Sequence, residues 1–436
     1  MTGGPPLPDL STIGLSAVEL SDSSVASLRD GILAWYLTEG YPFARLGMRV
    51  DPSGALAVRA VSGRHAALEE VRFDTLRKTS PGVLLRLLEM EVGQPYESER
   101  IARWRRRMEK LDYVAWVGDS RLALGPMGNM VLIQEIEEAP AGHFAASMGY
   151  SGSGVGDELE GGGEVITTNL LGTGRTLELS ARKVDYGGVD ASLRYREPWI
   201  FGIPLSVEVR AAQEIPDSAW VTREGELVLV WEAADFETWA GVGTWRGYPP
   251  GLPDQSYSYG LLGISTKLGR KLRQGWEGVT AGVEARMGEA TEVDSVGGSS
   301  QASAELSARL DEYTGALGLG LGVNAAGILE GQWLDGRLWR LGGAESLRGY
   351  PEGIYTTGRY VVARPEISVG ETSTRAYVFG DLSALDTGDY WTYPVGVGVG
   401  VRGKAGLFGV DASVGFPVRD GLDLTRLYLS AVARII

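Results

Sequence analysis

Apolar and polar residues repeat with two different periods along this chain, and the change falls near residues 138–141. Before that point, several segments carry an apolar residue at every third or fourth position, which is the period of an amphipathic helix. From residue 140 onward, apolar residues occupy alternate positions in segment after segment, as in half-buried β-strands. The pattern predicts a mixed front part at residues 1–139 and an all-strand back part at residues 140–436.

The front part is expected to contain two modules of mixed helix and strand. The first, residues 1–64, should hold a helix and two strands, at 25–40, 43–50 and 55–61. The second, residues 65–139, should run strand, helix, helix, strand, strand, at 68–74, 81–89, 96–112, 113–117 and 130–137. Ser80-Pro81 supplies a cap and a first-turn proline for its first helix. The front part is therefore α+β, and its second module has an ordinary domain size.

The back part is predicted to hold sixteen strands. They begin near residues 142, 162, 174, 188, 204, 218, 235, 256, 276, 298, 313, 355, 374, 393, 406 and 426. A further segment near 328–340 is doubtful as a strand and is left out of this count. One face of each strand is apolar, and the other is polar, charged or glycine, as where Val395, Val397 and Val399 alternate with glycine.

Alternation by itself fits two architectures, a soluble sandwich with its polar face outside and a membrane barrel with its apolar face outside. The even strand number and lengths of about 9–11 residues favour an antiparallel transmembrane β-barrel of 16 strands. The barrel must be closed, because an unpaired strand edge in hydrocarbon leaves backbone groups without partners. Aromatic residues near strand ends are expected to form interfacial girdles, and these are Trp199, Phe201, Trp231, Trp239, Trp245, Trp333, Trp339 and Trp391.

Composition narrows the function classes. The net charge of −15 argues against a nucleic-acid partner. The chain has no cysteine, and its two histidines, His65 and His143, lie far apart. Disulfides are therefore excluded. Two distant histidines also argue against a histidine-rich metal site or a Ser-His-Asp triad, so neither is expected. We expect no cofactor, no metal and no enzymatic activity. Gly320-x-Gly322 lies between alternating segments, so a dinucleotide site is not expected there.

The first residues lack the basic and apolar regions of a signal peptide. Either the chain is cytoplasmic or a signal peptide has been removed, and the barrel pattern favours the second. The cluster Arg103, Arg105, Arg106 and Arg107 is interpreted first as the solvated face of a helix. A peptide or lipid-headgroup contact is the alternative.

The most specific segment is Leu347-Arg348-Gly349-Tyr350, which follows Gly342-Gly343 and precedes Pro351. In this context it resembles the signature of the BamA/TamA-like outer-membrane assembly and translocation superfamily, carried on a loop that folds into the barrel lumen. Residues 65–139 resemble a POTRA domain, and residues 1–64 a partial or divergent one. Arg246-Gly247-Tyr248 repeats part of the string without the same flanks and is expected to be a turn.

The resemblance implies a site. Arg348 would pair with Glu366 and Asp381 in the lumen, where a guanidinium suits bidentate carboxylate contacts. The barrel seam would join the first and last strands at Gly149, Tyr150, Leu429 and Ala431. Gly149, Gly152, Gly154 and Gly156 would weaken it, since glycine inside a strand reduces its stability. The alternative for Leu347–Pro351 is a simple turn in a glycine-rich chain.

The implied function is assembly or insertion of outer-membrane proteins. A POTRA edge strand would capture unfolded client proteins by β-augmentation, with periplasmic accessory proteins or lipoproteins as further partners. The location would be the outer membrane of a Gram-negative-type bacterium, with the POTRA modules in the periplasm. Two alternatives stay open: a two-partner-type secretion pore for a dedicated protein, and a passive barrel or membrane anchor. The chain departs from the family in ending Arg434-Ile435-Ile436 and in having few POTRA modules.

Overall fold

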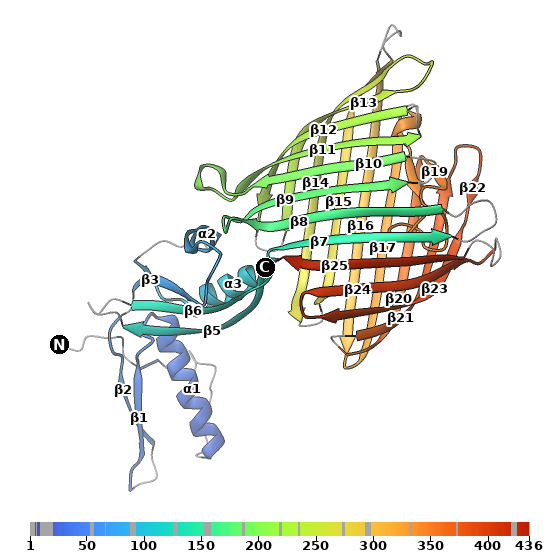
Figure 1. Cartoon of the computed structure of the whole chain (residues 1–436). Coiled ribbons are helices and arrows are strands. Elements are labelled where there is room, and N and C mark those ends of the chain that lie inside the picture. The colour runs from blue at the N-terminus through green and yellow to red at the C-terminus, as the bar shows by residue number, and fades with distance from the viewer. Residues whose placement is uncertain are drawn as a thin grey trace. The chain divides into compact units, whose positions relative to one another are not determined.

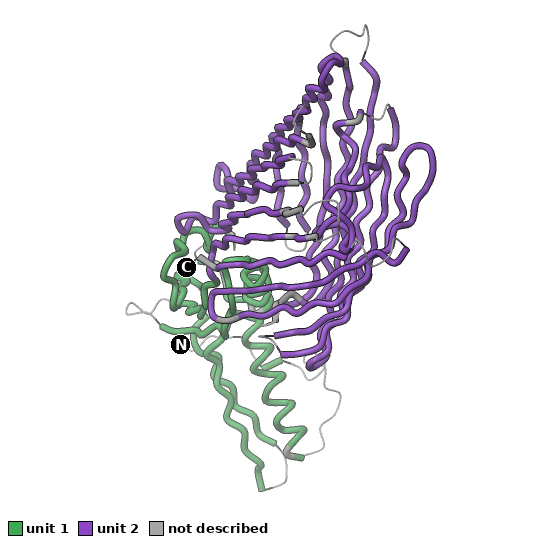
Figure 2. Tube along the Cα trace, turned by 45° about the vertical axis from the view of Figure 1, so that its right-hand side comes forward, with its two compact units in different colours: residues 1–139 green, residues 140–436 purple. Residues whose placement is uncertain are grey.

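The computed structural model describes residues 5, 7–8, 21–52, 56–65, 67–87, 93–124, 130–151, 158–184, 188–217, 220–233, 236–272, 275–292, 298–331, 334–371, 374–419 and 425–435. The chain forms two compact units, residues 1–139 and 140–436 (Figure 2). The description below takes them one at a time. Within the described ranges, no helix has the length and apolar character needed to cross a membrane.

The first unit begins with a helix packed on a hairpin (Figure 1). Helix α1 (Asp22–Thr38) starts at Ser21, whose hydroxyl accepts a hydrogen bond from the backbone N–H of Ser24 in a capping box. Strands β1 (Arg45–Val50) and β2 (Leu56–Val61) pair antiparallel. Leu28, Ile32 and Tyr36 are buried against the hairpin, so the predicted apolar stripe is the buried face of α1.

A four-stranded sheet with two helices completes the first unit. Its elements are β3 (Ala67–Asp74), α2 (Pro81–Leu87), β4 (Gln94–Pro95), α3 (Ser98–Glu109), β5 (Val114–Leu124) and β6 (Met130–Glu138). The spatial order is β4-β3-β6-β5, with β3 and β6 parallel and the other pairs antiparallel. The short strand β4 was not predicted, and β5 runs seven residues beyond its predicted end at Val117. The end of the first predicted helix, residues 88–89, lies outside the described residues.

Two polar features mark the surface of this unit. Arg103 on α3 is exposed and lies 4.0 Å from Glu99, and the half-buried Arg105 pairs with Glu109 at 3.0 Å. These local pairs favour the solvated-face interpretation. The Glu138 carboxylate accepts hydrogen bonds from the backbone N–H groups of residues 77–79 at 2.6–3.3 Å. Burial alone would raise the pKa of Glu138, but the hydrogen bonds from Thr79 and its neighbours outweigh that effect and lower it.

The second unit is a closed antiparallel barrel (Figure 1). Among the described residues it has sixteen long strands: β7 (Gly142–Ser151), β8 (Glu158–Leu170), β9 (Arg175–Val184), β10 (Gly188–Glu197), β11 (Leu205–Asp217), β12 (Trp220–Glu232), β13 (Phe236–Tyr248), β14 (Gln255–Leu272), β15 (Gly275–Glu292), β16 (Ser299–Thr314), β17 (Leu317–Glu330), β20 (Arg359–Gly370), β21 (Thr374–Asp386), β23 (Val395–Ala405), β24 (Phe408–Pro417) and β25 (Arg426–Ile435). The short strand β22 (Trp391–Thr392) pairs with the end of β21, and η3 (Ile200–Gly202) lies between β10 and β11. The predicted sixteen-stranded antiparallel barrel is confirmed.

The barrel is apolar outside and polar over much of its lumen. Val399 and Val401 on β23 are 54% and 51% exposed, whereas the intervening Gly400 lies beneath the ring of Tyr377. On β21, Arg375 and Asp381 are buried in the lumen while Val378 on the opposite face is exposed. Lumenal charges on β10–β16 pair with one another, as where Glu208 contacts Arg194, Arg196 and Arg210. This is the arrangement that suits a bilayer rather than a sandwich core.

The omission of the segment near 328–340 from the predicted strands is confirmed. Beyond the end of β17 this segment contains η4 (Asp335–Arg337) and β18 (Trp339–Leu341), which pairs with β19 (Tyr355–Thr357) outside the barrel ladder. Three of the aromatic residues assigned to interfacial girdles lie elsewhere. Trp245 is buried in a lumenal cluster with Trp239 packed against it, and Trp339 belongs to β18. Phe201, Trp231 and Trp391 are exposed, and Trp333 lies outside the described residues.

Candidate functional site

The segment that joins β17 to β20, residues 331–358, is the candidate site, and we call it the lumenal loop. It contains η4 and the β18–β19 hairpin. Its side chains contact β9 and the strands from β20 to β25, as the following contacts show. We call the end of the barrel at which β7 begins and β25 ends the terminal rim. The lumenal loop leaves the barrel at the opposite end.

Arg348 and Asp381 form the central contact of the loop. The guanidinium donates from Nε to Asp381 Oδ2 at 2.9 Å and from Nη2 to Oδ1 at 2.6 Å. The backbone N–H of Arg348 donates to the same carboxylate at 2.8 Å. Phe379 supports the guanidinium, whose carbon lies 3.6 Å from the ring centroid. Because the Asp381 side chain is 0% exposed, this carboxylate depends on Arg348 for its charge partner.

Glu366 lies near Arg348 but is not its main partner. The distance from Arg348 Nη1 to Glu366 Oε2 is 3.8 Å, whereas Arg402 Nη2 donates to the same oxygen at 2.9 Å. Arg402 also lies 3.3 Å from Asp411. The structure thus places Glu366 between two arginines. Arg402 and Asp411 extend the ionic contacts that the resemblance implied for Arg348, Glu366 and Asp381.

Gly349 and Tyr350 bring the loop against the last strands. Gly349 has φ +96°, and a Cβ there would lie 2.8 Å from the backbone of Phe416 on β24. Its N–H donates to the Tyr428 hydroxyl of β25 at 3.0 Å, and that hydroxyl donates to the Tyr350 carbonyl at 3.2 Å. Leu347 and Tyr350 are buried. The positive φ and the close approach to the backbone of β24 explain why glycine occupies position 349.

The glycines of β23 provide the surface on which this site lies. A Cβ at Gly396 would meet the Arg348 carbonyl at 1.8 Å, and a Cβ at Gly398 would meet the Phe379 ring at 2.4 Å. The alternating glycines therefore form a trough that admits the loop backbone and the aromatic rings of β21. The period-two glycine pattern was visible in the sequence, but nothing local indicated which residues would fill the space.

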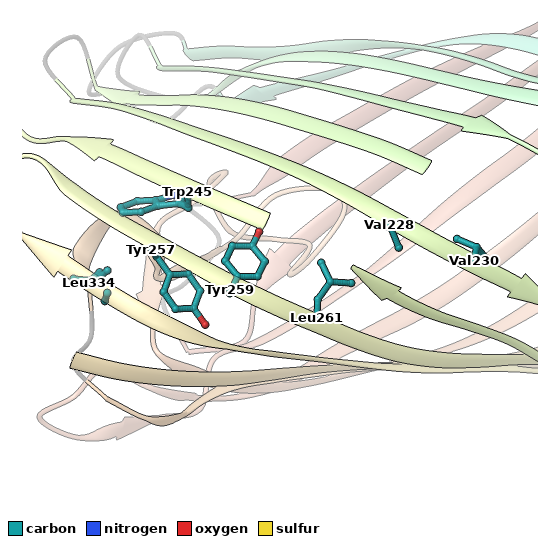
Figure 3. Packing of buried hydrophobic residues seen from close by; sticks show 8 residues of the cluster. Val228, Val230, Trp245, Tyr257, Tyr259, Leu261 and Leu334 are labelled. Carbon is teal, nitrogen blue, oxygen red and sulfur yellow. The ribbon is translucent and has the colours of Figure 1, made fainter. Parts of the chain in front are cut away.

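The loop has two further anchors, one on β13 and β14, far from Arg348 in the strand order, and one on β9. Leu334 packs in a buried cluster with Trp245, Tyr257 and Tyr259 from β13 and β14 (Figure 3). The Arg337 guanidinium lies 4.0 Å from the Tyr257 ring centroid. On β9, Arg182 pairs with Glu352 of the loop at 2.9 Å and with Glu345 at 3.2 Å. Because these anchors and Arg348 lie on different strands, the loop crosses the lumen.

The seam is continuous. β25 pairs with β7 in register from Leu427 opposite Tyr150 to Ile435 opposite Gly142. Gly149 lies opposite Tyr428, and Leu429 and Ala431 lie opposite Met148 and Ala146. β7 and β25 have 10 residues each, the same as β9, β10 and β24, so the seam ladder is similar in length to the ladders beside it. Gly152, Gly154 and Gly156, expected to weaken it, lie outside the described residues.

Other residues singled out in the sequence lie elsewhere. Arg246, Gly247 and Tyr248 end strand β13, and the turn begins only at Pro249, so the expectation of a turn at 246–248 is wrong. A strand continues there because Gly247 opposes Gln255 and Thr222 in the ladder. Gly320 and Gly322 lie within strand β17. His143 lies in β7 at the seam, opposite Arg434, and the ring of His65 contacts that of Tyr41 at 5.2 Å.

Comparisons with known proteins bear on the whole chain. No protein-family model matches it, and no curated protein does. Among solved structures, the chain is similar to BamA from Haemophilus ducreyi lacking POTRA domains 1–3, with a TM-score of 0.58, 15% identity and coverage of 97% of both chains.

Two CdiB structures are similar to the same degree. CdiB from Acinetobacter baumannii has a TM-score of 0.58 and 15% identity over 95% of this chain and 82% of its own. CdiB from Escherichia coli has a TM-score of 0.59 and 13% identity over 95% and 84%. At such identities the likeness establishes the fold. The chain therefore has the fold of these BamA and CdiB structures, and its described residues form a closed barrel of sixteen long strands.

Proposed function

We propose that this protein lies in the outer membrane of a Gram-negative-type bacterium and inserts other outer-membrane proteins through its barrel seam. The exposed apolar residues of the barrel strands support the membrane location. In this proposal the terminal rim faces the periplasm, residues 65–139 are a POTRA domain, and residues 1–64 are a divergent one. Periplasmic accessory proteins or lipoproteins would be further partners.

The observation that carries the proposal is the attachment of the lumenal loop to the seam strand. Gly349 and Tyr350 bind Tyr428 of β25, and β25 forms the seam with β7. The same loop is fixed to β21 through Arg348 and Asp381. In this proposal the loop holds one side of the seam in place while the other side, β7, separates and pairs with a client strand.

The sheet of the first unit offers an edge for client capture. Strand β5 is the outer strand in the order β4-β3-β6-β5, and among the described residues nothing pairs with its outer edge. Trp116 on this strand is 50% exposed. An extended client segment can add to such an edge through backbone hydrogen bonds, and Trp116 would contact its side chains.

A disulfide across the seam tests the proposal. The chain has no native cysteine, so Ala146→Cys with Ala431→Cys introduces a single pair at opposed positions of β7 and β25. We expect oxidation to stop insertion of a client barrel into vesicles and reduction to restore it. The matched control is Ala285→Cys with Ala304→Cys, opposed in β15 and β16, which should insert clients in both redox states.

Continued insertion by the oxidised seam variant would refute the seam mechanism. A secretion pore is the second candidate, because the CdiB structures match this chain as well as BamA does. A pore would pass a dedicated protein through the lumen with the seam locked, provided that the lumenal loop moves aside. A passive anchor would neither insert nor translocate protein with the seam open or locked.

A further inference from the structure

Three arginines lie along the lumenal side of β21, and each stacks on an aromatic ring. Arg348 lies 3.6 Å from the centroid of Phe379, and Arg402 lies 4.3 Å from that of Tyr377. Nearer the terminal rim, Arg375 lies 5.0 Å from the ring centroid of Tyr313. The three sites share a cation and a ring, which allows their remaining partners to be compared.

The first two arginines have carboxylate partners, whereas the third has none among the described residues. Arg348 binds Asp381, and Arg402 binds Glu366 at 2.9 Å. Arg375 donates to two neutral oxygens, the Ser368 hydroxyl at 3.2 Å and the Ala316 carbonyl at 3.0 Å. No carboxylate of the described residues lies within 4.0 Å of it, although Arg375 is only 7% exposed. A buried guanidinium normally has an anionic partner.

Arg375 lines a cavity of about 260 Å³ beside the terminal rim. This volume is several times the roughly 30 Å³ share of one water molecule in the liquid. Gly318 also lines the cavity, and a Cβ there would lie 2.6 Å from the Ser368 hydroxyl and 2.7 Å from Arg375 Nη2. The absence of a side chain at 318 therefore keeps the space around the guanidinium open.

The other charges of the cavity are already paired. Arg309 donates to Asp311 at 2.6 Å and 2.8 Å. Arg402 is held by Glu366 and Asp411. Lys404 also lines the cavity, so its four cations exceed its three carboxylates, Asp311, Glu366 and Asp411, and the lining is net positive.

We propose that this cavity is a binding site for a carboxylate group, which would complete at Arg375 the arrangement seen at Arg348 and Arg402. A carboxylate accepts the fork of guanidinium N–H groups, and Arg402 and Lys404 on β23 face the same cavity. Given its place at the terminal rim, the carboxylate belongs to a polypeptide, as its C-terminus or as an acidic side chain. Only this source depends on the proposed function; the site itself does not.

Calorimetric titration of the full chain in micelles at low salt tests the site. The probes are N-acetyl-trialanine with a free C-terminus, its C-terminal amide, and N-acetyl-Ala-Asp-Ala amide. We expect a carboxylate probe to bind at least tenfold more tightly than the neutral amide, since a hydrogen bond to a charged group contributes on this scale. Arg375→Gln should abolish the difference. Arg340→Gln, which removes the same charge from the exposed residue of β18, should retain it.

A second variant supplies the carboxylate within the chain. Ser368→Asp places an acid beside Arg375 Nε, where the serine hydroxyl now accepts, so it should block the probes and raise the unfolding temperature. This variant tests the site independently if Arg375→Gln does not fold. Folding of each variant is judged by its heat-dependent gel mobility.

The outcomes separate the site from the proposed function. Equal binding of acid and amide probes, or retention of the difference in the folded Arg375→Gln or Ser368→Asp variants, would overturn the carboxylate site. Tighter binding of inorganic phosphate than of either acid probe would also overturn it. Preference for the free C-terminus or for the aspartate probe would support the site and identify the source. None of these results depends on the insertion assay.

Discussion

At the scale of single residues, the lumenal loop is positioned by the buried carboxylate of Asp381. Asp381 is 0% exposed and accepts three hydrogen bonds from Arg348. Desolvation makes such a pair a weak source of net stability, but it makes the loss of one partner costly. Arg348 therefore acts less as a source of net stability than as the charge partner of a carboxylate that is buried away from water.

Replacing Arg348 by alanine should destabilise the folded barrel by about 3 kcal/mol, the range for an uncompensated buried charge. Asp381→Ala in the same chain removes that charge, and we expect the double variant to recover part of the loss. Urea unfolding in micelles, followed by gel mobility, measures both. Equal instability of the single and double variants would show that packing, not charge, dominates at this position.

Gly349→Ala separates close approach from backbone strain. Both Gly349 (φ +96°) and Gly406 (φ +60°) have positive φ, but a Cβ at 349 meets Phe416 whereas a Cβ at 406 meets nothing within 4 Å. Gly406→Ala should cost about 1 kcal/mol. Gly349→Ala should cost more and lower client insertion, because the loop must move from β24. Similar costs for the two variants in urea unfolding would argue against a tight fit of the loop.

At the scale of elements, strands and loops are held by groups that belong to other elements. The segment before α2 is fixed by Glu138 at the end of β6, through the backbone N–H groups of residues 77–79. The trough of β23 is filled by rings from β21 and by the lumenal loop. An element of this chain therefore depends on partners that its own sequence does not identify.

The first unit should lose stability in acid through Glu138. Because its pKa is lowered in the folded state, its contribution is present above the ordinary glutamate pKa near 4.3 and is lost as the pH falls through the lower folded value. Solvent exposure limits the effect to about 1 kcal/mol. Among the described elements, α-helices occur only in this unit, so helical circular dichroism during heating at pH 3–7 measures it. Glu138→Gln should flatten this dependence, and an unchanged profile would contradict it.

Replacing a glycine of β23 should destabilise the barrel most where an aromatic ring packs against that glycine. A Cβ at Gly398 would lie 2.4 Å from the Phe379 ring, whereas a Cβ at Gly225 in β12 meets nothing within 4 Å. We expect Gly398→Ala to destabilise the barrel by 1–3 kcal/mol, the usual range for overpacking. Gly225→Ala should be neutral or slightly stabilising. Unfolding of the two variants in urea gives the comparison, and equal stability would show that Phe379 moves aside freely.

At the scale of the whole barrel, the lumenal loop obstructs the lumen while the seam stays closed. The loop is anchored on β9, on β13 and β14, and on β21–β25. The anchors lie on different parts of the wall, so the barrel and the loop support each other. Under the proposed function, this arrangement favours release of clients at the side of the barrel over passage through its centre.

Removal of the loop tip should open the lumen. Deletion of residues 343–352 removes Arg348 and the two loop carboxylates that pair with Arg182, and it leaves the anchor at Leu334. We expect single-channel conductance in planar bilayers to rise several-fold over the intact chain, because a barrel of 16 strands leaves an aqueous channel when nothing fills it. Unchanged conductance would mean that the remaining lumenal side chains close the pore without the loop.

The period of the apolar residues determined the architecture of this chain. Alternation over residues 140–436 and the strand spacing were enough to predict sixteen antiparallel strands, because lipid requires an apolar outer face and a closed ladder. Leu28, Ile32 and Tyr36 likewise identified the buried face of α1. Periodicity is a local property that depends on the geometry of each element, so a single sequence contains it.

Only the tertiary structure decided which side chains meet in the lumen. Trp245 follows the strand pattern of a girdle residue, yet it packs inward on Leu334, because a lumenal loop offers the same apolar contact as lipid. Glu366 pairs with Arg402, and no carboxylate of the described residues pairs with Arg375. Such pairings depend on strand register and on a loop that returns from a distant position, and neither is encoded in the spacing of neighbouring residues.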